Sequence, residues 1–122
     1  MDIEAFRDYC LSKPFVEESF PFDQSTLVFK VSGKIFALTN LYSASFSVNL
    51  KCDPEKAIEL RELYTEVKPG YHMNKKHWNT VDFDGYLRQR KLVEMIDHSY
   101  ELVVKKLPAK QRDIILKKLN QI

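Results

Sequence analysis

The sequence predicts an α+β fold, a single domain over residues 1–122 with a mainly antiparallel sheet and helices on one side. Three observations predict it. Two runs of strand-forming residues flank a two-residue turn, a third run alternates polar and apolar side chains, and several segments repeat apolar residues at helical spacing. With 122 residues, 44% of them hydrophobic, the chain has enough apolar surface for one core and lies outside the disordered classes.

The first third of the chain predicts a short helix followed by a hairpin. Residues 2–13 place apolar side chains at helical spacing, and residues 15–23 read as an extended lead-in. Residues 26–31 and 34–39 are rich in Val, Ile, Leu and Phe, as strands are. Because only Ser32-Gly33 separates the two runs, we expect a tight β-hairpin.

The middle of the chain predicts a strand, a helix and a second strand. Residues 45–51 alternate apolar and polar side chains, so this strand has one wet face, which carries Lys51. Asp53-Pro54 is a typical helix start, and the apolar stripe runs to Val67, so the helix should end before Pro69-Gly70.

Residues 71–83 are predicted to form the second strand. Its alternation places His77 and Asn79 on the face of Val81 and Phe83, and Trp78 on the opposite face.

The last third predicts two helices. Residues 86–106 carry a broad apolar stripe at helical spacing, and Pro108 ends this helix. Residues 110–119 should form a short final helix.

Several functional classes find no support in the sequence. The start of the chain is acidic and no long apolar run follows, so we expect a cytoplasmic protein that makes no contact with membranes, and we expect a monomer. No GxSxG, P-loop or GxGxxG motif occurs, and the Cys and His spacings do not suggest a metal site. We therefore expect no catalysis, no cofactor and no bound metal.

The densest group of chemically active side chains lies at Lys75-Lys76-His77-Trp78-Asn79. The lysines could contact phosphates, while Trp78 could stack on a base and Asn79 could meet a base edge. The competing interpretation is structural: a polar turn enters a strand, and the sole Trp packs beneath a loop or helix.

Charge is distributed unevenly although the net charge is only +2. Residues 1–25 hold two basic and six acidic side chains, whereas residues 85–122 hold nine basic and four acidic ones. The basic residues near the end that are candidates for phosphate contact are Lys105, Lys106, Lys110 and Arg112. A solvated helix face with lysines near helix C-termini is the alternative explanation.

The sequence resembles the MmcQ/YjbR family through three motifs in order, HMNKKHWNTV at 72–81, DFDG at 82–85 and IDHSYELV at 96–103. Shorter matches elsewhere are FRDYC at 6–10, KP at 13–14, EE at 17–18, PFD at 21–23, KIFAL at 34–38, KCDP at 51–54, VKPGYH at 67–72 and LP at 107–108. The resemblance covers nearly the whole chain.

The resemblance implies a small bacterial protein with a frataxin-like, double-wing type of α+β fold, of a family commonly labelled DNA-binding. It implies no catalytic residue or cofactor, and among the candidates it supports only residues 75–79. Our leading hypothesis is therefore a DNA-binding module in which the lysines hold phosphates and Trp78 is exposed to the ligand. The alternative is a small-molecule or protein interaction module with a pocket around Trp78.

Overall fold

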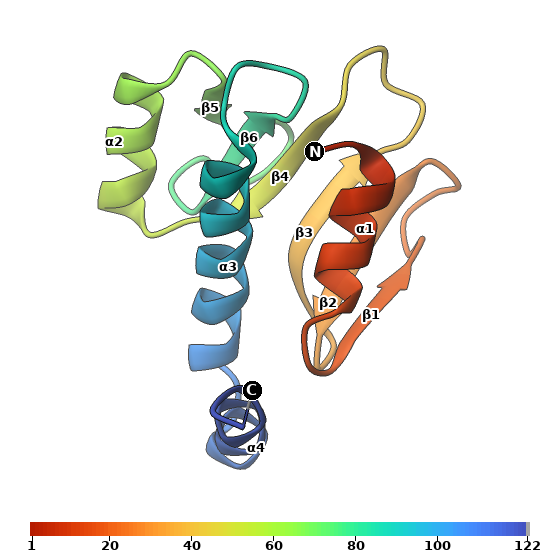
Figure 1. Ribbon diagram of the computed structural model, residues 1–122, viewed down its shortest axis with the longest axis vertical. Helices are drawn as coiled ribbons and strands as arrows, with labels where there is room; N and C mark the ends of the chain where they lie inside the picture. Colours follow the sequence, from red (N-terminus) through yellow and green to blue (C-terminus); the bar gives the residue numbers. More distant parts are fainter. Residues whose placement is uncertain (122) are drawn as a thin grey trace.

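Six strands form one antiparallel sheet in the computed structural model, which describes residues 1–121, and the strand order is β1-β2-β3-β4-β6-β5. The strands are β1 (Val16–Ser19), β2 (Thr26–Val31), β3 (Lys34–Asn40), β4 (Ser47–Lys51), β5 (Val67–Pro69) and β6 (Trp78–Asp82). The helices are α1 (Ile3–Leu11), α2 (Pro54–Leu63), α3 (Gln89–Lys105) and α4 (Ala109–Leu119). In Figure 1, α1 and α3 lie in front of the sheet and α4 extends beyond its lower end. The expected α+β fold with helices on one side is confirmed.

The predicted hairpin is present as β2 and β3. Ser32 and Gly33 both adopt the left-handed backbone region, with φ of 47° and 83°. Two consecutive positive φ angles are what a type I′ turn requires, and this turn matches the twist of paired strands. The segment predicted only as an extended lead-in at residues 15–23 also contains a strand of the sheet. Its residues 16–19 pair with β2 as the edge strand β1.

The predicted helix after Asp53-Pro54 is shorter than its apolar stripe suggested. It ends at Leu63, and Tyr64 is already extended, with φ of −127° and ψ of 125°. Val67 belongs to β5, where it pairs with Val81 of β6. The prediction was wrong here because long-range strand pairing overrode a local periodicity that fits both structures.

The strand predicted at 71–83 is confirmed only at its end. Residues 71–77 form a loop, in which His72 adopts a left-handed φ of 58° and the Asn74 side-chain oxygen accepts a hydrogen bond from the Lys76 N–H at 2.9 Å. Within β6 the expected alternation holds, since Asn79 and Val81 are buried on the side of the core.

Aromatic side chains join the helices to the sheet. The ring of Phe6 on α1 meets Phe29, Phe46 and Phe83 edge-on, at centroid distances of 5.3, 5.7 and 5.5 Å. Such edge-to-face pairs add stability beyond the burial of their area. Phe29 lies on β2, Phe46 directly precedes β4 and Phe83 directly follows β6, so the ring of Phe6 joins α1 to three separate segments of the chain. In Figure 1, α1 lies over the β1–β3 part of the sheet.

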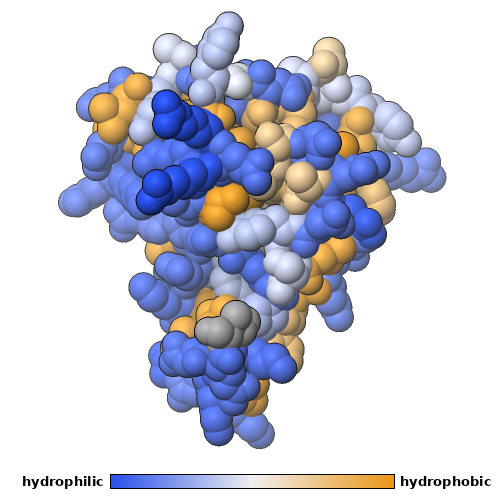
Figure 2. Space-filling view, in the orientation of Figure 1, coloured by the Kyte–Doolittle hydropathy of each residue, from blue (hydrophilic) through white to orange (hydrophobic). Residues whose placement is uncertain are grey.

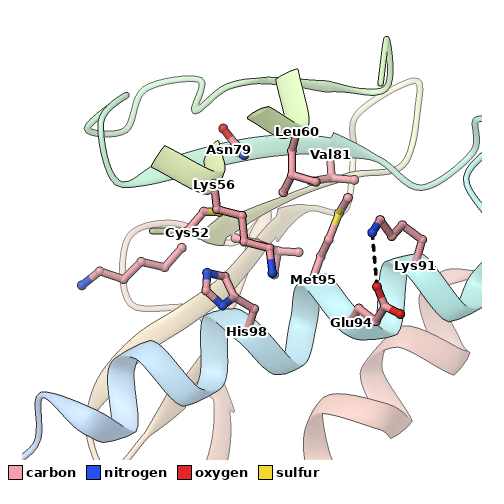
Figure 3. A pocket seen from close by; sticks show the side chains of 11 residues that line it. Cys52, Lys56, Leu60, Asn79, Val81, Lys91, Glu94, Met95 and His98 are labelled. Atoms are coloured by element: carbon pink, nitrogen blue, oxygen red, sulfur yellow. Dashed lines mark hydrogen bonds and ion pairs between the residues drawn. The ribbon is translucent and has the colours of Figure 1, made fainter. Parts of the chain in front are cut away.

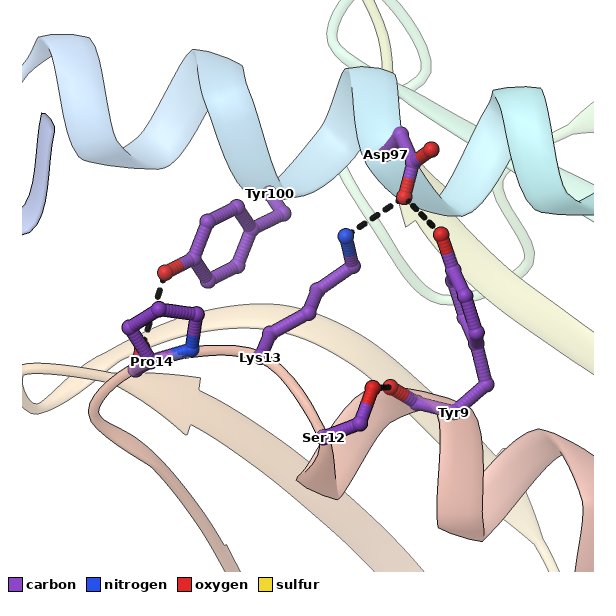
Figure 4. A network of polar contacts seen from close by, with 6 residues as sticks. All are labelled: Tyr9, Ser12, Lys13, Pro14, Asp97 and Tyr100. Atoms are coloured by element: carbon purple, nitrogen blue, oxygen red, sulfur yellow. Dashed lines mark hydrogen bonds and ion pairs between the residues drawn. The ribbon is translucent and has the colours of Figure 1, made fainter. Parts of the chain in front are cut away.

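A polar network ties α1 to α3 (Figure 4). The Tyr9 hydroxyl donates to Asp97 Oδ1 at 2.5 Å, and the Lys13 ammonium group lies 2.5 Å from the same oxygen. The Tyr100 hydroxyl donates to the carbonyl of Pro14 at 2.7 Å. These contacts fix the end of α1 and the turn that follows it against the middle of α3.

The face that carries the helices is mostly hydrophilic, with hydrophobic side chains confined to small separate areas (Figure 2). Within residues 1–121 the structure has no helix that combines the length and apolar character needed to span a membrane.

Candidate anion-binding surface

The face of the sheet opposite the helices presents a row of side chains defined by strand register. Val28 pairs with Leu38, Leu38 with Asn49, and Asn49 with Thr80. None of these four belongs to the core cluster, whose members from the same strands alternate with them. This row therefore marks a helix-free face, and its polar half comes from β4 and β6.

Two hollows lie on or beside the helix-free face. The first, which we name the sheet groove, has a volume of about 470 Å³ and lies between the loop before β2 and the loop before β6. Its floor is polar: the Thr80 hydroxyl donates to Asn49 Oδ1 at 2.5 Å and accepts from the Tyr71 N–H at 2.9 Å. Its lining residues are Phe22, Asp23, Thr26, Leu38, Thr39, Asn40, Ser43, Ser47, Asn49, Tyr71, His72, Met73 and Thr80.

The second hollow, which we name the lysine hollow, has a volume of about 600 Å³ and lies where the β2–β3 turn meets the end of α3. Phe22 borders this hollow as well as the sheet groove, so the two adjoin. Four ammonium-bearing side chains contribute to its lining, which is completed by apolar residues; the lysines are Lys30, Lys34, Lys51 and Lys106.

The charge of the lysine hollow is uncompensated. None of its four lysines lies within 4.0 Å of a carboxylate among residues 1–121. The carboxylate nearest by strand register belongs to Glu17, the cross-strand partner of Lys30. Burial, together with the positive charge of Lys106, lowers the pKa of Lys51 below its ordinary value. An anion placed in the hollow would relieve this repulsion.

Lys51 is held at the hollow by its backbone. Its N–H donates to Ser99 Oγ at 2.9 Å, and the Ser99 hydroxyl donates to the carbonyl of Phe36 at 2.5 Å. Ser99 is fully buried, so its bond to the Phe36 carbonyl is shielded from water, and the bond from Lys51 is partly shielded. The same serine thus joins β3 and β4 to α3 and brings the end of α3, with Lys106, beside Lys51.

Trp78 connects the predicted segment to this surface. It is the cross-strand partner of Lys51, and both residues point away from the core. The sequence left open whether Trp78 is exposed to a ligand or packed beneath a loop or helix. Its side chain is half-buried, which lies between these two interpretations. Lys51 therefore lies beside the Trp78 strand and also lines the hollow together with Lys106 from the end of α3.

The other residues of the predicted segment have different surroundings. The Lys75 ammonium group donates to the carbonyl of Gly70 at 3.1 Å, and the Lys76 side chain is exposed. His77 is half-buried, and its carbonyl accepts from the Cys52 N–H at 2.8 Å. Asn79 is buried, and its side-chain oxygen accepts from Arg61 Nε at 2.7 Å. Asn79 therefore supports the strand and does not present its amide to a ligand.

Only one of the predicted C-terminal residues reaches the hollow. Lys106 lines the hollow. Lys105 does not line it, and its positive charge instead contributes to lowering the pKa of His98 on another side of α3. Lys110 and Arg112 lie on α4, and Arg112 Nε is 3.2 Å from Asp113 Oδ1. Sequence reasoning missed Phe22, Lys30 and Lys34 as site residues. The period-two pattern that places Lys51 on the wet face of its strand is the signal that could have found Lys51 itself.

A further cavity lies between α2 and α3 (Figure 3), and it is too small for a ligand. Its volume of about 20 Å³ has room for one water molecule. Burial raises the pKa of the Cys52 thiol to about 11, so it is not a reactive thiolate at neutral pH. His98 Nε2 accepts a hydrogen bond from the Asp53 N–H at 3.2 Å. We interpret this cavity as a packing seam. Across residues 1–121 no three His, Cys, Asp or Glu side chains gather as a metal site would require.

Comparison with known proteins identifies the family. The family model described as YjbR matches residues 11–102. An uncharacterized protein named YjbR from Escherichia coli strain K12 is 34% identical over 116 residues, which cover 95% of this chain and 98% of the relative. The chain belongs to the YjbR family. The uncharacterized protein YbdF of Escherichia coli O157:H7 is also similar, with 41% identity over 101 residues, or 83% of each chain.

Solved structures of similar sequence share the fold. The crystal structure of Deinococcus radiodurans protein DR2400, described as a DUF419 domain, has a TM-score of 0.86 at 40% identity. The match covers 93% of this chain and 86% of that one. A crystal structure from Pseudomonas syringae has a TM-score of 0.74 at 29% identity, and covers 84% of this chain and 98% of that chain. The resemblance to the YjbR family inferred from the sequence motifs is confirmed.

Proposed function

We propose that this YjbR-family protein is a non-catalytic DNA-binding module whose phosphate contacts are centred on the lysine hollow. The observation that carries the proposal is the convergence of Lys30, Lys34, Lys51 and Lys106 on one hollow, without ion-pair partners in the part of the chain that the structure describes. Lysine ammonium groups that neutralise phosphates release counterions, which provides most of the affinity for nucleic acid.

The surroundings of the hollow support a binding role without catalysis. Phe22 is exposed at its border and Trp78 lies across the strand pair from Lys51, so aromatic rings are available beside the positive charge. The described lining offers ammonium groups and apolar side chains, with no carboxylate or imidazole to move a proton. This arrangement suits retention of an anionic chain better than a reaction upon it.

Fluorescence titration of Trp78, the sole Trp of the chain, tests the proposal directly. Mixed-sequence DNA oligonucleotides should change its emission, and binding should weaken steeply between about 50 and 200 mM salt. The double variant Lys51→Met with Lys106→Met should lose at least about tenfold in affinity. The slope of log affinity against log salt concentration should fall by the equivalent of about two phosphate contacts. The matched control, Lys110→Met with Lys117→Met on α4, should remain within about twofold of the wild type if α4 lies outside the contact area.

Two results would count against the proposal. If neither single-stranded nor duplex DNA binds at low salt, DNA binding is lost. If the hollow variant and the α4 control behave alike, the phosphate contacts lie elsewhere. Binding of a small neutral compound that ignores salt would favour the alternative, an interaction module with a pocket near Trp78.

A further inference from the structure

We infer that the ligand of this surface is a single strand, with an unstacked base in the sheet groove and the neighbouring phosphate in the lysine hollow. The inference rests on the proposed function and adds the form of the nucleic acid and the place of its base. Phe22 borders both hollows, so one nucleotide unit could occupy the two together. The volume of the groove, about 470 Å³, lies within the range of sites that bind small ligands.

The walls of the groove are suited to stacking. Phe22 and Tyr71 come from different loops, and their side chains are 66% and 69% exposed. Exposed aromatic rings on either side of a polar floor are the platform on which single-stranded nucleic acid stacks its bases. Each such contact is worth about 5- to 150-fold in affinity.

The Tyr71 wall is fixed in place before a ligand arrives. Its N–H donates to Thr80 Oγ1 at 2.9 Å, and its carbonyl accepts from the Asn49 amide at 3.4 Å. The His72 ring lies 4.0 Å from the Tyr71 ring, and His72 itself is held at a φ of 58°. A non-glycine residue in this left-handed region costs energy, so the surrounding structure must hold it there. The loop therefore holds the Tyr71 backbone in place, so ligand binding does not have to order it.

The polar floor can read the edge of a base. The Ser47 hydroxyl and the Asn40 side-chain NH2 line the groove and can form hydrogen bonds with a ligand, whereas the Asn49 amide and the Thr26 hydroxyl are engaged by neighbouring groups of the protein. Unstacked bases are recognised through such contacts, because their edges are free of a pairing partner.

The shape of the surface disfavours a duplex. Reading B-DNA requires a helix or ribbon that enters a major groove about 12 Å wide. Here the polar groups lie on the floor of a groove between two loops on a helix-free sheet face, so a paired and stacked base could not reach them. A splayed single strand could.

The test compares three probes on the full-length protein by competition: a twelve-residue oligothymidylate, a hairpin duplex of equal phosphate number, and free thymidine monophosphate. The single strand should bind at least tenfold more tightly than the duplex. The double variant Phe22→Ala with Tyr71→Ala should weaken single-strand binding by at least about 25-fold and leave duplex binding within twofold. Tyr86→Ala, which removes a 99% exposed tyrosine outside the groove, is the matched control and should change nothing.

The outcomes separate the two proposals. If the duplex binds as tightly as the single strand and still depends on Lys51 and Lys106, the single-strand inference is wrong and the DNA-binding function stands. If no DNA binds, the proposed function fails and the inference fails with it. If the monophosphate matches the oligonucleotide in affinity, the ligand is a free nucleotide and the strand is excluded. Should the alanine variant fold poorly, Phe22→Leu with Tyr71→Leu keeps apolar volume, removes the rings and should show the same single-strand loss.

Discussion

Lys51 and Trp78 are direct partners across β4 and β6, although α2 and β5 separate them in the sequence. Ser99 anchors the backbone of Lys51 to α3, so Lys106 at the C-terminal end of that helix also lies near Lys51. Positive charge that the sequence spreads over several segments thus converges beside the sole Trp. The net charge of +2 conceals this local concentration.

Lys51→Met should weaken anion binding and slightly stabilise the fold at neutral pH. Burial and Lys106 lower the pKa of Lys51, so the charged form costs stability below that folded pKa, and the cost disappears as pH rises through it. Because the side chain is partly exposed, we expect a gain of at most about 0.5–1 kcal/mol. Urea unfolding at pH 7 and pH 10.5 measures this, and the gain should shrink at the higher pH.

Lys105→Met provides the control for that experiment, since Lys105 is exposed on α3 and does not line the hollow. It should change neither property. A Lys51→Met variant that is less stable than the wild type at pH 7 would show that the ammonium group has a stabilising partner.

The sequence predicts local features of this fold well and long-range pairings poorly. The hairpin turn at Ser32-Gly33 needs only its own two residues, and the alternation within β6 needs only that strand. Val67 shows where local patterns fail. Its spacing from the preceding apolar residues fits a helix, but its pairing with Val81 places it in a strand. The edge strand β1 was missed for a similar reason, as its strand character comes from β2.

The candidate site divides in the same way. Trp78 and Lys51 could each be placed on an outward face by alternation. That they face outward side by side depends on the β4–β6 register, which no local pattern encodes. Asn79 was correctly placed on the inner face but given a role in binding, because nothing in the sequence indicated that Arg61 would occupy its side-chain oxygen.

The stability of the α2–α3 contact should depend on pH through His98. Burial, reinforced by the charge of Lys56, lowers the pKa of His98 below its ordinary 6.5. The neutral imidazole accepts from the Asp53 N–H, so its contribution is complete above pH 6.5 and is lost as pH falls through the lower folded pKa. After allowance for solvent screening we expect a loss below about 1 kcal/mol between pH 7 and pH 5.

Urea unfolding of His98→Gln over the same range checks that expectation. Gln does not titrate, so the difference in unfolding free energy between wild type and variant should narrow as the pH falls. A constant difference between wild type and His98→Gln would exclude the imidazole as the source.

Asp97→Ala should destabilise the protein more than loss of an ordinary surface carboxylate. The change removes the acceptor of the Tyr9 hydroxyl and leaves the Lys13 ammonium group, largely buried, without its partner. We expect a loss of about 1–3 kcal/mol, against about 1 kcal/mol for Tyr9→Phe, which removes a single hydrogen bond. Glu101→Ala, exposed on the same helix, is the comparison in chemical denaturation. Equal midpoints for the Asp97 and Glu101 variants would contradict the prediction.

Arg61→Ala should loosen the loop that leads into β6, and Trp78 reports on it. Arg61 Nε donates to Asn79 Oδ1 at 2.7 Å, and its Nη2 donates to the Trp78 carbonyl at 3.2 Å and to the Lys75 carbonyl. Loss of the guanidinium leaves the buried Asn79 oxygen without its donor, which should cost about 1–3 kcal/mol. Acrylamide should then quench Trp78 more efficiently, because the backbone on both sides of it is released.

Arg61→Lys separates charge from geometry in this contact. A lysine keeps the positive charge but lacks the planar guanidinium that lets Arg61 reach three acceptors at once. Arg61→Lys should therefore behave like Arg61→Ala in quenching, and its stability should lie between those of the wild type and Arg61→Ala. Arg7→Ala removes an arginine that pairs with Glu18 on the other side of the molecule, and should leave Trp78 quenching unchanged. If Arg61→Ala also leaves quenching unchanged, the loop is held by its own turn at Asn74, and the contribution of Arg61 is limited to Asn79.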